Sequence, residues 1–112
     1  MSAGATVESI REALLALGVR PGGILLVHSS LKSLGLVPGG ADTVIDGLLT
    51  ATGSSGTLLM PALSYECVTF ENPVFDVLNT PANVGLIAET FRRRPGTLRS
   101  LHPTHSICAS GV

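Results

Sequence analysis

The chain has few charged residues, and neither sign of charge dominates. Seven Lys and Arg and eight Asp and Glu among 112 residues give a formal net charge of -1. Proteins that bind nucleic acids or anionic membranes need clustered basic side chains, so the composition argues against both kinds of partner. The basic run from Arg92 to Arg94 is short and suits the last turn of a solvated helix.

Cysteine is scarce as well, and long apolar runs are missing. The two cysteines, Cys67 and Cys108, have a separation that matches no metal or redox motif, and we expect both to be buried or half-buried free thiols. No stretch looks like a secretion signal, and the apolar runs are too short to cross a membrane. We therefore expect a cytoplasmic protein without a metal site.

The residues that are plentiful predict an α/β fold. Apolar residues make up 45% of the chain, enough for a folded core. Two patterns alternate along the chain: apolar residues at helical spacing, and short apolar runs that are typical of buried strands. The predicted helices are 7–17, 42–52 and 83–94, and the predicted strands are 24–27, 57–60 and 106–109.

We expect residues 1–112 to form one domain, layered α/β/α with a mostly parallel central sheet. Three strands would leave the edges of such a sheet open. The chain is therefore predicted to be the N-terminal part of a larger domain, or to be completed by another chain, for example in a homo-oligomer. Residues 62–82 lack periodicity, and their aromatic side chains indicate a long ordered loop of the functional kind.

Three polar segments are predicted at the carboxyl ends of the strands, where open parallel sheets bind ligands. They are 28–33 after the first strand, 64–66 after the second, and 102–106 before the third. All three histidines of the chain lie in these segments. The spacing of His102 and His105 lacks the third ligand of a zinc site, and the sequence has no glycine-rich nucleotide loop.

Hydrogen-bond donors are concentrated in the first and last of these segments. The first offers hydroxyl, amide and ammonium donors that suit a phosphate or an amide-rich ligand: His28, Ser29, Ser30, Leu31, Lys32 and Ser33. The last is denser: Arg99, Ser100, His102, Thr104, His105 and Ser106. The planar fork of Arg99 suits a phosphate. The alternative for the first segment is a structural His28 and serines that satisfy the loop backbone.

Tyr65 and Glu66 follow the second strand, where an acceptor substrate would meet the bound ligand. Together with Glu71 and Asp76, Glu66 gives the loop an acidic character, because no Lys or Arg occurs between residues 62 and 82. This charge favours a cationic acceptor. A solvated acidic loop is the alternative interpretation.

Three stretches resemble the aminoglycoside 3-N-acetyltransferase family. They are VHSSLKSLGLVPGGADTVIDGLL, GTLLMPALSY and NPVFDVLNTPANVGLIAETFRRRPGTLRSLHPTHSICASG, and together they cover nearly the whole chain from about residue 7. The resemblance is specific, because the H-S-S-L-x-S-L-G, G-T-L-x-M-P and R-S-x-H-P-T-H-S motifs occur in the order and spacing of the family.

The resemblance implies transfer of an acetyl group from acetyl-coenzyme A to the 3-amino group of 2-deoxystreptamine aminoglycosides, which gives antibiotic resistance. It further implies that the first and last segments, His28–Ser33 and Arg99–Ser106, help to hold coenzyme A. Tyr65 and Glu66 would lie on the acceptor side. The general base of the family would lie beyond residue 112, which leaves the catalytic residue unknown.

Two alternatives stay open beside this interpretation. The protein could be a relative with the same fold that acylates a different amine. It could also be a truncated chain that holds coenzyme A, or packs on a partner, without turnover.

Overall fold

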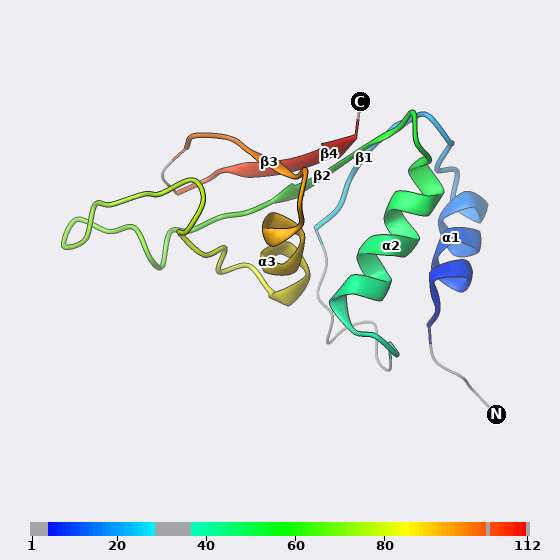
Figure 1. The fold of residues 1–112 in the computed structure, drawn as a ribbon, viewed down its shortest axis with the longest axis horizontal. Coiled ribbons are helices and arrows are strands. Elements are labelled where there is room, and N and C mark those ends of the chain that lie inside the picture. Colours follow the sequence, from blue (N-terminus) through cyan, green and yellow to red (C-terminus); the bar gives the residue numbers. More distant parts are fainter. Residues whose placement is uncertain (1–4, 29–36, 103, 112) are drawn as a thin grey trace.

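A computed structural model describes residues 5–28, 37–102 and 104–111. Within these residues three helices lie on one side of a four-stranded sheet, and the segment between β2 and α3 projects from one end of that sheet (Figure 1). The fold is therefore α/β, as the sequence predicts.

Helix α1 (Val7–Ala16) begins at the predicted cap. The hydroxyl of Thr6 accepts a hydrogen bond from the N–H of Ser9 at 3.1 Å, and the N–H of Thr6 donates to the Ser9 hydroxyl at 2.7 Å. This reciprocal capping box satisfies two backbone donors that the helix leaves free. The chain leaves the helix through Gly18, whose positive φ of 109° suits glycine.

Helix α2 (Ala41–Thr52) provides the centre of the core. Val44, Ile45 and Leu48 are buried on the side of strand β2 (Thr57–Pro61), whose Leu58 and Met60 belong to the same apolar cluster. These are the apolar positions that the helical and strand patterns predict.

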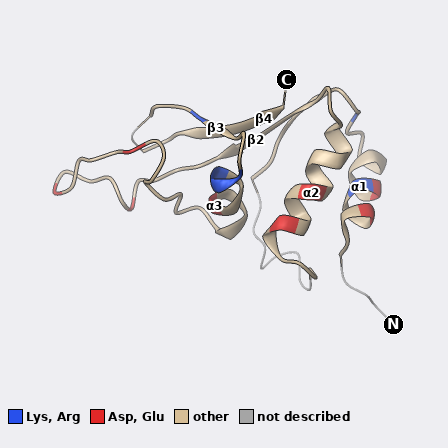
Figure 2. Cartoon of the chain, in the orientation of Figure 1, with Lys and Arg blue, Asp and Glu red and all other residues tan. Residues whose placement is uncertain are grey.

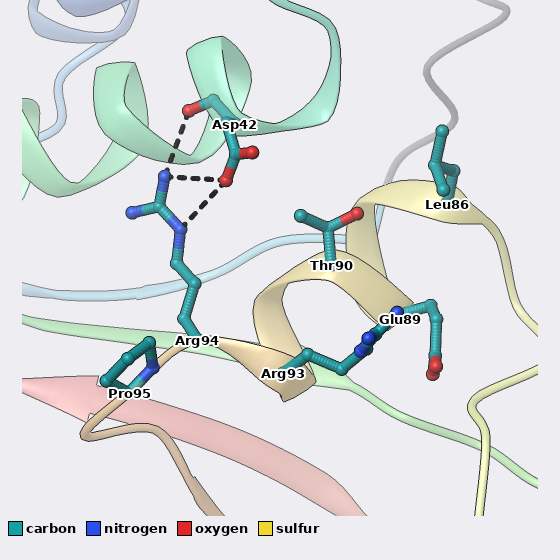
Figure 3. A pocket seen from close by; sticks show the side chains of 7 residues that line it. All are labelled: Asp42, Leu86, Glu89, Thr90, Arg93, Arg94 and Pro95. Atoms are coloured by element: carbon teal, nitrogen blue, oxygen red, sulfur yellow. Dashed lines mark hydrogen bonds and ion pairs between the residues drawn. The ribbon is translucent and has the colours of Figure 1, made fainter.

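Helix α3 (Leu86–Arg93) begins three residues later than the sequence predicts. Asn83 belongs to the preceding segment instead, because its backbone N–H donates to the carbonyl of Leu63 at 2.8 Å. At the other end of the helix, the Arg94 guanidinium pairs with Asp42 at 3.0 Å and with Asp46 at 2.8 Å. Figure 3 shows how Arg94 reaches Asp42 across the space between α3 and α2.

The sheet has the order β1-β2-β4-β3 and is mixed. Strands β1 (Ile24–Leu26), β2 and β3 (Leu98–Arg99) run in one direction, whereas β4 (Ile107–Gly111) runs against its two neighbours. Most of the strands therefore share a direction, as predicted, but two of the three pairings are antiparallel. The sequence pattern misses β3, which is only two residues long. After β2 the chain passes through α3 and forms β3 at the far edge of the sheet. Strand β4 then runs back in the opposite direction and lies between β3 and β2.

The two faces of the sheet differ in burial. Leu58, Met60 and Cys108 point toward the helices and are 2% exposed or less. On the opposite face Ile24 is 77% exposed and Leu98 is 74% exposed. No helix covers that face within the described residues, so the second helical layer of the α/β/α architecture stays a prediction.

The two cysteines are free thiols, as expected, with Cys67 half-buried and Cys108 buried. Burial raises the pKa of the Cys108 thiol. No helix in the described part of the chain is long and apolar enough to cross a membrane.

Gly47 is predicted to be essential for the contact between α1 and α2. A Cβ atom added at Gly47 would lie 2.6 Å from Cγ2 and 2.7 Å from Cβ of Ile10. Alanine is intrinsically better in a helix by about 1 kcal/mol, but this clash costs about 1–3 kcal/mol. We expect Gly47→Ala to lower the free energy of unfolding in urea titrations. In an Ile10→Gly background, which removes both of these atoms, the same change should become neutral or stabilising. A more stable Gly47→Ala single variant would contradict the close packing.

Candidate functional site

The antiparallel pairing of β2 and β4 brings two of the predicted polar segments together. Pro61 at the end of β2 pairs with Ile107 at the start of β4. Beyond this pair, the N–H of Ala62 donates to the carbonyl of Ser106 at 2.8 Å, and the N–H of Ser64 donates to the carbonyl of Thr104 at 2.9 Å. Segment 64–66 and segment 102–106 therefore lie side by side at one end of the sheet.

His102 organises the turn that precedes β4. Its Nδ1 atom accepts hydrogen bonds from the backbone N–H of Thr104 at 3.2 Å and from the N–H of His105 at 2.9 Å. Because Nδ1 acts as an acceptor, the proton of the neutral ring is placed on Nε2. The His102 side chain is exposed, so this N–H is a donor available at the surface.

Tyr65, His105 and His102 form a cluster of three rings. The ring of Tyr65 stacks on that of His105 with centroids 6.4 Å apart and an interplanar angle of 26°. The ring of His102 meets His105 edge-on, with centroids 5.5 Å apart. Thr104 Oγ1 lies 2.7 Å from His105 Nδ1 and fixes that ring further. The ring cluster thus presents apolar faces and hydrogen-bonding nitrogens on one exposed surface.

Beneath the ring cluster, Arg99 and Ser106 belong to a polar network inside the protein. The Arg99 guanidinium donates from Nε to the Ser106 hydroxyl at 2.8 Å, from Nη2 to the carbonyl of Ala62 at 3.0 Å, and from Nη1 to the carbonyl of Thr80. It also lies 4.9 Å from the centroid of the Phe75 ring. The Ser106 hydroxyl is fully buried and donates to the carbonyl of Ala62 at 2.8 Å. Burial lowers the pKa of the Arg99 guanidinium.

Helix α3 holds the end of the projecting segment through an ion pair. Glu89 and Arg92 are 2.6 Å apart, and Arg92 Nη1 donates to the carbonyl of Leu78 at 2.8 Å. Glu89 Oε1 accepts from the N–H of Ala82, also at 2.8 Å. Burial opposes ionisation of Glu89, but the hydrogen bonds from Arg92 and Ala82 outweigh it, so the pKa of Glu89 is lowered. The segment is therefore ordered mainly by polar contacts to its backbone.

Asn83 contacts the candidate site residue Glu66, and the sequence analysis missed this contact. Its Oδ1 accepts from the N–H of Glu66 at 3.1 Å, which fixes the position of Glu66, while its buried Nδ2 has no hydrogen-bond partner. A buried donor without a partner is rare in proteins. The sequence offers no signal for this contact, because the two residues are seventeen positions apart.

His28 lies at the same end of the sheet but in different surroundings. It is exposed and lines a small hollow with Pro61 and Val84, next to helix α3. The structure places it there and not in the ring cluster. The predicted residues Ser29, Ser30, Leu31, Lys32 and Ser33 lie outside the described residues.

A cavity of about 320 Å³ lies between α2 and α3, and it contains none of the predicted site residues. It is lined by Asp42, Leu86, Glu89, Thr90, Arg93, Arg94 and Pro95 (Figure 3). Two of its polar groups, Asp42 and Arg94, are paired with each other, and Glu89 is paired with Arg92. The polar groups of this cavity therefore serve mainly to join α3 to its neighbours.

Comparison with known proteins identifies the family of the chain. The model of the aminoglycoside 3-N-acetyltransferase family matches residues 26–112. The chain belongs to this family.

Relatives and solved structures agree with this assignment. The aminoglycoside N(3)-acetyltransferase III of Salmonella sp is 37% identical over 95% of the chain. The crystal structure of AAC-IIIb in its binary complex with CoASH superimposes with a TM-score of 0.87, at 31% identity over 98% of the chain. AAC-VIa bound to sisomicin gives the same TM-score at 30% identity over 97% of the chain. The chain spans 43% of the length of the Salmonella relative and 47% of each of these two structures.

In this structure, most of the predicted site residues that are described fall into two groups. Tyr65, His102, Thr104 and His105 meet in or beside the ring cluster, whereas Arg99 and Ser106 face the interior. Ser100 is exposed and extends the pairing of β3 and β4, because its N–H donates to the carbonyl of Ile107 at 2.9 Å. No group of three or more His, Cys, Asp or Glu side chains is suited to hold a metal ion in the described ranges.

The role of His102 in its turn can be tested by two substitutions. Asparagine offers an acceptor oxygen close to the position of Nδ1, whereas alanine offers none. We expect His102→Ala to disturb the stacking of Tyr65 on His105 and His102→Asn to preserve it. Tyr65 is the only tyrosine of the chain, and tryptophan is absent. Near-ultraviolet circular dichroism therefore reports on the Tyr65 ring. Equal signals from the two variants would show that the acceptor does not organise the turn.

The ion pair of Glu89 predicts a pH-dependent stability. The pKa of the Glu89 carboxyl is lower in the folded protein than its value of 4.5 in the unfolded chain. The ionised carboxylate therefore stabilises the folded protein at pH values above 4.5. This stabilisation is lost as the pH falls through the pKa of the folded state. At neutral pH we expect Glu89→Gln to lower the free energy of unfolding by about 1–3 kcal/mol. In urea titrations the difference should shrink as the pH falls below 4.5. The control is Glu12→Gln, because Glu12 is exposed on α1. A difference for Glu89→Gln that does not change with pH would contradict the ion pair.

Proposed function

We propose that the protein is an acetyl-coenzyme A-dependent aminoglycoside 3-N-acetyltransferase. The observation that carries this proposal is family membership, together with the close superposition on a coenzyme A-bound and a sisomicin-bound structure. Bound acetyl-coenzyme A would supply a thioester. An amide bond forms between its acyl carbon and the 3-amino group as the C–S bond breaks, and coenzyme A leaves as the thiol.

The exposed surface of the ring cluster has the chemistry to hold coenzyme A. Coenzyme A carries amide groups, phosphates and an adenine ring, which need hydrogen-bond donors and flat apolar surfaces. His102 offers an Nε2 donor, and Thr104 and His105 lie beside it on the same turn. We propose that these three residues and Ser100 contact coenzyme A, together with segment 28–33.

The projecting segment is suited to a polycationic acceptor. Figure 2 shows acidic residues along it and no basic ones. Glu66, Glu71 and Asp76 are exposed. Hydrogen bonds from Asn79 and from the N–H of Leu78 lower the pKa of Asp76, so its carboxylate stays ionised at neutral pH. We propose that Tyr65 and Glu66, at the base of this segment, lie on the acceptor side.

The mechanism requires that the attacking amine lose a proton, and a base with a pKa near neutrality does this best. We propose that the described residues bind and orient the two substrates, and that the general base lies beyond residue 112. A cytoplasmic location is proposed, because acetyl-coenzyme A is a cytoplasmic metabolite. Association with a second copy of the chain stays a prediction.

Calorimetric titration of acetyl-coenzyme A, followed by an acetylation assay, tests this function. We expect saturable one-site binding that His105→Ala weakens and the distant control Arg11→Ala leaves unchanged. With sisomicin as acceptor, a chain that includes the proposed general base should give a product that carries the acetyl group on the 3-amino nitrogen.

Each alternative function has its own outcome in the same experiment. Acetylation of a different amine would identify the protein as a relative of other specificity. Binding without turnover by a chain that includes the proposed general base would identify a protein that only holds coenzyme A. The absence of saturable binding would remove the proposed cofactor site from this part of the protein.

A further inference from the structure

Three of the five N–H groups of Arg99 donate to the protein, and the remaining two, one on each Nη, belong to a half-buried side chain. An arginine binds a phosphate best through two parallel N–H groups on neighbouring nitrogens. Each of the three guanidinium nitrogens of Arg99 already donates to a protein oxygen, on Ser106, Ala62 or Thr80. The fork formed by Nε and Nη2 is occupied by the Ser106 hydroxyl and the carbonyl of Ala62, which are hydrogen-bonded to each other, so a phosphate would have to displace both acceptors to bind there. Buried acceptors left without a donor are costly.

We propose that Arg99 is a positioning residue, which holds Tyr65 and Glu66 against the turn of His102 and His105 and does not itself bind the cofactor. This role rests on the proposed function, because it concerns the support of the same site. Arg99 acts through the backbone of the segment that it binds and through Ser106, the neighbour of His105.

The contacts of Arg99 close the projecting segment at both ends. The carbonyl of Ala62 lies at the start of the segment and that of Thr80 near its end, so one guanidinium joins two points eighteen residues apart. Ordering such a loop costs conformational entropy. Few apolar side chains of the segment are buried, with Val68 the largest of them, whereas Phe70 at its tip is fully exposed. Polar contacts to the backbone must therefore supply much of its order.

The same contacts tie the segment to the ring cluster. Ser106 accepts from Arg99 and donates to the carbonyl of Ala62, and its own carbonyl accepts from the N–H of Ala62. Tyr65 follows Ala62 by three residues, and His105 directly precedes Ser106. Without the Arg99 guanidinium, the two sides of the Tyr65–His105 stack lose a shared support.

Three variants and three measurements test this role. Arg99→Met removes the guanidinium, and Arg99→Lys keeps the charge but not the planar fork. Arg93→Met is the matched control, because Arg93 is exposed on the last turn of α3. The measurements are hydrogen exchange of the backbone amides, near-ultraviolet circular dichroism of Tyr65, and the salt dependence of the dissociation constant for coenzyme A.

For a positioning residue, we expect Arg99→Met to speed the exchange of protected amides in segment 62–82 about tenfold or more, while those of α1 and α2 keep their protection. The Tyr65 signal should weaken. Coenzyme A should bind less tightly, but with an unchanged dependence on salt, since no charge contact to a phosphate is lost. Arg99→Lys should recover part of the Tyr65 signal, and Arg93→Met should resemble the wild type.

The opposite pattern would overturn the proposal. Unchanged exchange and Tyr65 signal, with a weaker salt dependence of binding, would make Arg99 a phosphate ligand. If the Arg99→Met variant loses protection from hydrogen exchange throughout the chain, the Ser106→Ala variant is measured in its place. Ser106→Ala removes only one of the three acceptors of Arg99. Faster exchange confined to segment 62–82 would then support the role, and unchanged exchange would refute it. If the wild type does not bind coenzyme A, the proposed function fails, whereas the exchange and the Tyr65 signal still decide the role of Arg99.

Discussion

The antiparallel pairing of β2 with β4 is the constraint on which the rest of the site depends. It sets the end of one strand beside the start of the other, so that two polar segments forty residues apart in sequence lie in contact. In a fully parallel sheet, the segment before a strand would lie at the opposite end from the segment after its neighbour. The ring cluster of Tyr65, His105 and His102 exists because β4 reverses the direction of the chain.

A division of labour follows from this pairing. The side chains that point outward from the two segments are exposed and able to meet a ligand, whereas Arg99 and Ser106 point inward and bond to backbone oxygens. A second polar contact, the pair of Glu89 and Arg92, holds the same projecting segment from helix α3. Binding residues on a loop need such support, because a loop with little apolar burial does not fix their positions by itself.

The sequence predicts the regular elements well, and it predicts the inward contacts poorly. Apolar spacing identifies the helices and the buried residues Leu58 and Met60. The residue type of Thr6 just before the first helix identifies the cap. Each of these features depends on residues that are close in sequence. The two-residue strand β3 leaves no periodic signal, and without it β4 cannot be recognised as the return strand. Likewise, the composition of the last polar segment shows that it is rich in donors. Which of those donors face solvent depends on contacts such as that of Arg99 with Thr80, nineteen residues away.

These inward contacts change how the motif R-S-x-H-P-T-H-S is interpreted in this chain. Its polar residues form a single run in sequence, which suggests one shared task. In the structure, strand alternation places Arg99 on the core side of the sheet with Cys108, its partner in register, while the turn that follows carries His102 and His105 to the surface. One short motif thus provides both a binding surface and the support beneath it. The strength of a motif as evidence for a family is therefore separate from the role of each of its residues, and only the geometry assigns those roles.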